Sequence, residues 1–167
     1  NTASALYASI GGGQNNLANN IYSTISGGSE NGATGQYSFV GSGSNNIAGG
    51  QNSVVGGGLN NLSMGDYSAI VGGSDNSSTN QFSFIGNGSL NIASGQYSAI
   101  VGGSSNGSTG VYSFVGCGSQ NVAGKTSSVV AGGTQNRAMG DYSGISSGFN
   151  NGTTGDYSFI GSGSLNQ

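Results

Sequence analysis

The hydrophobic positions of this chain recur every fifteen residues, and the glycine and polar positions between them keep the same register. We number the positions of this unit as columns, with Tyr7 in column 1. Column 4 is Ile or Val in every copy, column 7 is Gly and column 10 is Asn. No residue is inserted or deleted across the eleven copies. Stacked coils exclude insertions whereas loops tolerate them, so the repeat predicts a solenoid.

Each unit divides into two strand-like stretches and two turns. Columns 1 to 5 are rich in Tyr, Phe, Val and Ile, which is typical of a strand with alternating sides. Columns 6 to 8 are rich in Gly and Ser and predict a turn, where the glycine of column 7 needs a positive φ or has no room for a Cβ atom. Columns 10 to 13 predict a second strand. Column 14, mostly Gly or Asn, predicts a second turn through the left-handed region.

These elements predict one all-β domain over residues 1–167, a parallel β-solenoid or β-roll of eleven 15-residue coils. Each coil is expected to hold two short strands, in columns 2 to 5 and 10 to 13. At about 4.8 Å per coil, the rod would be roughly 50 Å long.

Alternation along the strands places columns 2, 4 and 6 inside the coil, opposite columns 10 and 12. Cys117 lies in column 6, so we interpret it as a small buried residue. The apolar interior consists of the column 4 residues, which are Ile10, Ile25, Val40, Val55, Ile70, Ile85, Ile100, Val115, Val130, Ile145 and Ile160.

The asparagine column is expected to form a ladder of hydrogen bonds from coil to coil, because a buried amide needs partners. A solvated turn position is the alternative. The ladder residues are Asn16, Asn31, Asn46, Asn61, Asn76, Asn91, Asn106, Asn121, Asn136 and Asn151. The turn glycines are Gly13, Gly28, Gly43, Gly58, Gly73, Gly88, Gly103, Gly118, Gly133, Gly148 and Gly163.

The outward columns form apolar stripes that the thin interior does not explain. Burying one Ile or Val contributes about 1.5–3 kcal/mol, whereas ordering each residue costs about 1–2 kcal/mol, so we expect further apolar burial outside the coil. Long outward stripes are normally an interface, and a partly wetted monomer surface is the alternative. The expected interface residues are Phe39, Phe84, Phe114, Phe159, Ile47, Ile92 and Val122. A superperiod of 75 residues runs through the same columns, and Phe in column 3 always coincides with Gly in column 5.

Composition excludes most other chemistry. The chain has no His and only seven charged residues, with a net charge of -3. We therefore expect no enzyme, no catalytic, cofactor-binding or metal-binding residue, no nucleic-acid partner and no membrane insertion. Asp66, Asp141 and Asp156 share column 15, where a carboxylate pair on adjacent coils could bind a cation. An exposed turn is the alternative that we favour for them.

Five glycosylation sequons occur, and only the one at Asn87 lies outside column 10. If column 10 is buried, the other four cannot carry a glycan.

The spacing resembles the head repeat of trimeric autotransporter adhesins, the YadA-like head. The positions that match are Val40, Gly43, Asn46, Ala48 and the turn residue Gly50, with one residue added to the fourteen-residue motif and Asn in place of Ser. The resemblance covers all eleven coils and implies a left-handed β-roll assembled as a trimer on a cell surface. Similar repeats also resemble parts of long bacterial or viral fibres.

The expected function is a structural or adhesive extracellular fibre module, on a cell surface or a virion, whose partner is another copy of itself. A fibre segment that binds a receptor protein or a glycan is one alternative. An ice-binding solenoid is another, although column 13 lacks a regular threonine array. The first and last coils hold complementary halves of a unit, so we expect head-to-tail stacking or a longer repeat array.

Overall fold

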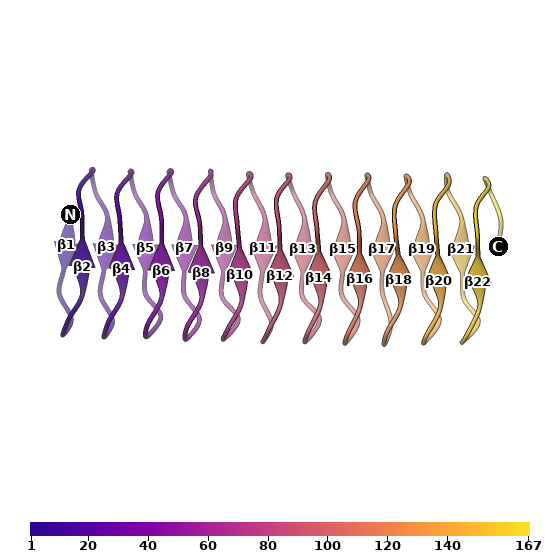
Figure 1. Cartoon of the computed structure of the whole chain (residues 1–167), viewed down its shortest axis with the longest axis horizontal. Coiled ribbons are helices and arrows are strands. Elements are labelled where there is room, and N and C mark those ends of the chain that lie inside the picture. The colour runs from indigo at the N-terminus through magenta and orange to yellow at the C-terminus, as the bar shows by residue number, and fades with distance from the viewer.

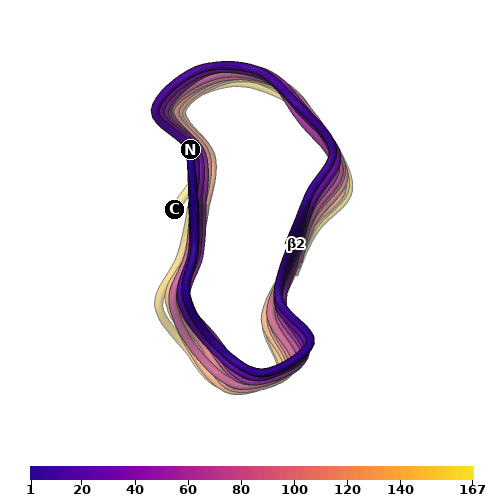
Figure 2. The same ribbon diagram turned by 90° about the vertical axis from the view of Figure 1, so that its left-hand side faces the viewer.

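The computed structural model describes residues 1–167 as an all-β parallel solenoid without helices. Figure 1 shows the coils side by side along a rod, with the two termini at opposite ends, and Figure 2 shows them superposed as a flattened ring. Each strand pairs in parallel with the strand one coil away, and partner residues are fifteen positions apart, as in Phe39 with Val54. The predicted fold class is confirmed.

The strands form two parallel sheets of 11 strands each on opposite sides of the ring. The odd-strand sheet contains β1 (Thr2–Ala3), β3 (Leu17–Ala18), β5 (Gly32–Ala33), β7 (Ile47–Ala48), β9 (Leu62–Ser63), β11 (Ser77–Ser78), β13 (Ile92–Ala93), β15 (Gly107–Ser108), β17 (Val122–Ala123), β19 (Arg137–Ala138) and β21 (Gly152–Thr153). The even-strand sheet contains β2 (Ser9–Ile10), β4 (Thr24–Ile25), β6 (Phe39–Val40), β8 (Val54–Val55), β10 (Ala69–Ile70), β12 (Phe84–Ile85), β14 (Ala99–Ile100), β16 (Phe114–Val115), β18 (Val129–Val130), β20 (Gly144–Ile145) and β22 (Phe159–Ile160).

The strands are shorter than the sequence predicts, because they occupy only columns 3 to 4 and 11 to 12. The residues of columns 1 and 9, which directly precede the two expected strands, adopt left-handed conformations, with φ from 53° at Ser127 to 59° at Gln135. A left-handed residue interrupts the extended chain. Hydrogen bonding nevertheless continues past each strand, as from the Gly41 amide to the Val55 carbonyl at 2.9 Å.

The second turn also differs from the prediction. Column 14 is not the left-handed position; column 1 is, and it is tyrosine in eight copies. Most column 14 residues are glycines that lie close to the next coil, while Asn20, Asn80 and Lys125 occupy the column in the other three copies. A Cβ atom on Gly35 would lie 2.0 Å from the carbonyl oxygen of Gly50 in the next coil.

The interior consists of columns 2, 4, 10 and 12, which are buried along the middle of the rod. Column 4 supplies Ile and Val, column 12 supplies Ala, Ser or Thr, and the other two columns supply Ser and Asn. Column 6 does not belong to the interior, contrary to the prediction. The chain has already turned there, so most of its residues are partly or fully exposed.

Candidate functional site

The asparagine ladder joins each coil to both of its neighbours. The Asn61 backbone amide donates to Asn46 Oδ1 at 3.0 Å, and Asn61 Nδ2 donates to the same oxygen at 3.1 Å. Nδ2 also donates to the carbonyl oxygens of Gly57 at 3.0 Å and Gly73 at 2.9 Å. A Cβ atom on Gly58 would lie 2.6 Å from Asn61 Nδ2 and 2.1 Å from the Gly73 oxygen. Glycine in column 7 leaves the space, and asparagine in column 10 makes the hydrogen bonds, that together hold adjacent coils in contact.

All ten ladder asparagines of the sequence analysis are buried, and all eleven turn glycines have φ between 88° at Gly13 and 127° at Gly163. The column 4 residues from Ile25 to Ile145 are also buried. Ile10 and Ile160 are only half-buried, contrary to the expectation, because each lies in an end coil with a neighbour on one side.

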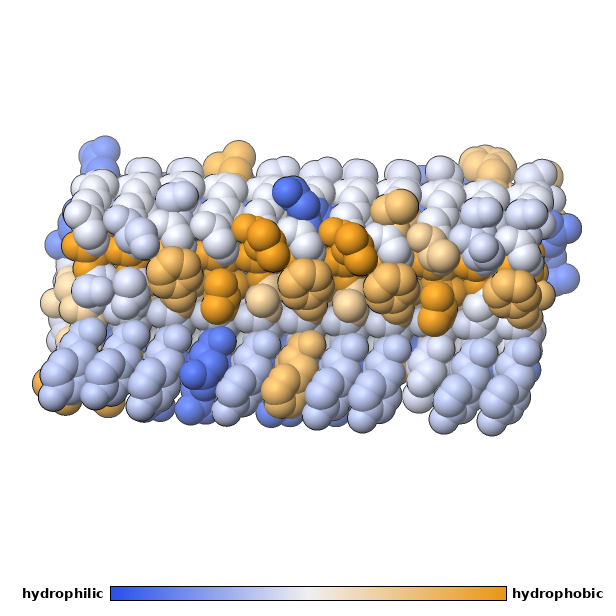
Figure 3. Space-filling view, viewed as in Figure 1, coloured by the Kyte–Doolittle hydropathy of each residue, from blue (hydrophilic) through white to orange (hydrophobic).

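The even-strand sheet presents an apolar strip to the outside, which Figure 3 shows as a line of hydrophobic residues along the rod. We call it the aromatic strip. It consists of the large residues of columns 3 and 5, which are Phe39, Val54, Val71, Phe84, Val101, Phe114, Val129 and Phe159. Phe39, Phe84 and Phe114 are 36% to 38% exposed, and Phe159 in the last coil is 70% exposed.

Within the strip, a large residue in one column accompanies a small residue in the other. A Cβ atom on Gly41 would lie in ordinary contact with the Phe39 ring, at 3.5 Å, but only 2.2 Å from the carbonyl oxygen of Gly56 in the next coil. Where column 5 is Val71 or Val101, column 3 is alanine. No coil therefore carries a large residue in both columns of the strip.

A row of aromatic rings from column 1 runs beside the strip and is visible below it in Figure 3. The rings of Tyr97 and Tyr112 stack with centroids 4.9 Å apart and an interplanar angle of 10°. Five other neighbouring pairs stack in the same way, with centroids 4.7 to 5.1 Å apart. Asn52 and Ser127 interrupt this tyrosine row. The sequence places the tyrosines in one column, but it does not reveal that they are left-handed and stacked.

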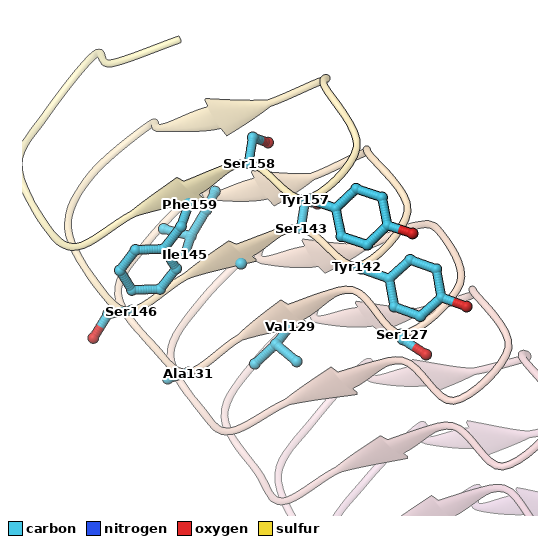
Figure 4. A pocket seen from close by; sticks show the side chains of 11 residues that line it. Ser127, Val129, Ala131, Tyr142, Ser143, Ile145, Ser146, Tyr157, Ser158 and Phe159 are labelled. Atoms are coloured by element: carbon cyan, nitrogen blue, oxygen red, sulfur yellow. The ribbon is translucent and has the colours of Figure 1, made fainter.

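One hollow interrupts the strip near the C-terminal end (Figure 4). Its volume is about 400 Å³, and it forms where Gly144 leaves column 3 without a side chain. The rings of Tyr142, Tyr157 and Phe159 and the side chain of Val129 surround it. The hollow is therefore an apolar depression with enough room to admit an aromatic ring.

The odd-strand sheet presents a more broken surface. Ile47, Ile92 and Val122 lie here, on the face opposite the phenylalanines, so the expected interface residues belong to two separate surfaces. Ile92 is 49% exposed, whereas Ile47 and Val122 are half-buried. Leu62 and Ser77 lie between Ile47 and Ile92 along the rod, Gly107 lies between Ile92 and Val122, and Arg137 follows Val122.

The carboxylates of column 15 bond to the backbone. Asp66 Oδ1 accepts the Gln51 amide at 2.9 Å, and Asp156 Oδ1 accepts the Asp141 amide at the same distance. Asp141 Oδ1 accepts the amide of Thr126. These carboxylates join adjacent coils, and the structure contains no group of three His, Cys, Asp or Glu side chains that could hold a metal ion.

Cys117 is exposed, so the prediction of a buried thiol was wrong. Of the five sequon asparagines, Asn87 is exposed, and the other four are buried in the ladder. No helix is long and apolar enough to cross a membrane.

Comparison with known proteins gives no relative: no protein-family model matches the chain, and no curated protein matches it.

Proposed function

We propose that this chain is a non-catalytic structural module of an extracellular fibre, and that it associates with copies of itself through its outward apolar surface. The observation that supports the proposal most directly is the aromatic strip. It runs along the even-strand sheet, and no charged residue occurs in columns 1, 3 or 5. Contiguous exposed apolar surfaces of this kind mark interaction sites.

The rod itself fits a structural role. The backbone amides on both sides of each strand donate to the adjacent coil, and the asparagine ladder adds side-chain bonds in the same direction. Such a stack resists bending and stretching along its axis. The resemblance to YadA-like heads adds left-handed winding and a cell-surface or virion location as further parts of the proposal, and the trimer that it implies is the alternative to the two-copy assembly argued below.

Light scattering on the purified chain tests the proposal. We expect a defined oligomer or filament at micromolar concentration, and a shift towards the monomer in the double variant Phe84→Ser, Phe114→Ser. Thr79→Ser with Thr109→Ser, on the opposite face, is the matched control and should assemble like the parent. A parent chain that stays monomeric and unfolds cooperatively would contradict the proposal.

A glycan-binding fibre segment is the second candidate, and the hollow in Figure 4 favours it. Three aromatic rings around a depression, with the serines Ser127 and Ser146 in its lining, provide the stacking surface and the hydroxyl groups that sugars use. A glycan array with the parent and with Tyr157→Ser tests this candidate. Binding that Tyr157→Ser abolishes would support it, and an array without binding would reject it.

A further inference from the structure

Large and small side chains alternate along the central coils of the aromatic strip. When the order of these coils is reversed, each large side chain lies opposite a small one. We propose that two copies pack face to face through their even-strand sheets with antiparallel rod axes, related by a two-fold axis that runs along the strands between β12 and β14. This pairing rests on the proposed self-association and specifies its partner, its face and its register.

The central coils show the match most clearly. A two-fold axis in this position keeps the columns and reverses the order of the coils, so β12 of one copy faces β14 of the other. Phe84 then faces Ala99 of the second copy, and Gly86 faces Val101. Each large side chain meets a small one in both columns, which is what close packing between two surfaces needs.

The match continues outward from the axis. Phe114 and Gly116 face Ala69 and Val71 in the next pair of coils. In the following pair Val54 faces Val129, two side chains of equal size, so the alternation of large and small residues does not extend to this pair.

The hollow near Gly144 fits the same arrangement. Phe39 of one copy faces Gly144 of the other, so the ring meets the one coil between β6 and β22 that has no large side chain in column 3 or column 5. The hollow is then a socket for Phe39. It is also lined by Tyr142, Tyr157 and Phe159, which offer ring contacts to an entering phenylalanine.

The tyrosine row obeys the same symmetry. Its two interruptions, Asn52 and Ser127, face each other across the proposed axis, and elsewhere aromatic rings face aromatic rings, as in Phe82 with Tyr97. A polar pair thus coincides with the place where Val54 meets Val129. The absence of charge in columns 1, 3 and 5 leaves no like-charge repulsion between the two faces.

Other arrangements match less well. In a parallel pair in register, as in a parallel trimer, corresponding coils of the chains lie at the same level. Each phenylalanine then faces the same phenylalanine of another chain. An antiparallel register shifted by one coil places Phe84 against a second Phe84 in one direction and against Phe114 in the other. Shifts by the five-coil superperiod restore the match, but over fewer coils. The central register therefore has the largest complementary contact.

Cross-linking between levels of the rod tests the pairing. In a Cys117→Ser background, Thr24→Cys and Phe159→Cys each place one thiol in column 3 near one end. The proposed pair brings these two positions to the same level, and a bismaleimide that spans about 10 Å, the usual spacing of packed sheets, should join them. Two Thr24→Cys thiols would lie about 40 Å apart at the usual strand spacing. We expect cross-linked dimers in the equimolar mixture and none in either single variant.

Each alternative result is informative. Cross-links within the single variants would establish a parallel assembly and overturn the proposal. No cross-link in a sample that scatters as an oligomer would overturn the pairing and leave self-association intact. A monomer by light scattering would overturn both.

A substitution at the centre of the face provides a second measurement. Ala99→Lys places a charge against Phe84 of the second copy and should raise the dissociation constant at least ten-fold. Thr109→Lys, directly after β15 on the opposite face, is the matched control and should leave the constant unchanged. If both variants associate like the parent while circular dichroism shows both to be folded, the even-strand face is not the contact and the proposal fails.

Discussion

At one corner of every coil the chain turns over an invariant glycine and asparagine, and at the other it turns over a position that is usually tyrosine. The first, which we call the Gly–Asn corner, spans columns 6 to 10 and bonds inwards, through the asparagine ladder. The second, the tyrosine corner, spans columns 14 to 1 and interacts outwards, through stacked rings. Both corners contain non-glycine residues in the left-handed conformation.

This difference explains which columns vary among the eleven copies. The ladder amide must reach carbonyl oxygens in fixed positions on two coils, and only asparagine has the required length and donors. A stacked ring on the surface can be replaced locally, and Asn52, Phe82 and Ser127 show that it is. We infer that the Gly–Asn corner fixes the stacking of the coils, whereas the residue at the tyrosine corner can change from coil to coil and so alters only the outer surface.

The largest effect is expected at the Gly–Asn corner, in Gly88→Ala. Gly88 has φ 104°, and a Cβ atom there would lie 2.1 Å from the Gly103 carbonyl oxygen. Backbone strain and the displaced coil together should cost about 4 kcal/mol of unfolding free energy. Urea unfolding followed by circular dichroism measures the loss. Gly102→Ala is the matched control, because its nearest contact would be 3.7 Å, and it should unfold like the parent. Equal losses in both variants would contradict this explanation.

The next effect is expected in Asn91→Ala. The change removes the acceptor of the Asn106 amide and the donor to the carbonyl oxygens of Asn87 and Gly103. Leaving such buried groups without partners should cost about 3 kcal/mol. Asn19→Ala, at an exposed position of the same rod, is the control. A loss in Asn91→Ala no greater than the control's would mean that the ladder does not stabilise the stack.

The repeat allowed the fold to be predicted from the sequence because coil stacking imposes one register on every column. The positions of Val40 inside and Phe39 outside followed from alternation alone. The conformation of the tyrosine corner could not be predicted in this way. Glycine favours the left-handed region and tyrosine disfavours it. The sequence therefore predicted the left-handed position in column 14, whereas it lies in column 1.

The candidate interface was predictable only in part. Outward apolar residues were identified, but assigning Ile92 and Phe84 to opposite faces required the paths of both strands around the coil. Cys117 was misplaced because alternation was extended past the point where the strand ends. The hollow at Gly144 depends on three neighbouring coils and has no signature in any single repeat.

A smaller effect is expected at the tyrosine corner, in Tyr97→Asn. The Tyr97 ring stacks on Phe82 at 4.8 Å and on Tyr112 at 4.9 Å, and both contacts would be lost. Asparagine adopts the left-handed backbone more readily than tyrosine, as at Asn52, so the measured loss is a lower bound on the stacking contribution. We expect a loss of about 1 kcal/mol, the usual value of such ring pairs at a partly exposed site. Ser127→Tyr, which fills an interruption of the row, should stabilise the rod; if it destabilises the rod, the row is not a source of stability.

The smallest effect is expected at Cys117, on the outer edge of the Gly–Asn corner. Only its backbone carbonyl takes part in the ladder, where it accepts a hydrogen bond from Asn121 Nδ2 at 3.1 Å. The side chain is exposed, so Cys117→Ser should change the unfolding free energy by less than about 0.5 kcal/mol. The same exposure predicts that a thiol reagent modifies Cys117 in the folded protein as fast as in the urea-unfolded chain, within an order of magnitude. Modification that occurs only after unfolding would show that the side chain points inwards. In that case, it would be wrong that only the backbone of Cys117 bonds inwards while its side chain stays exposed.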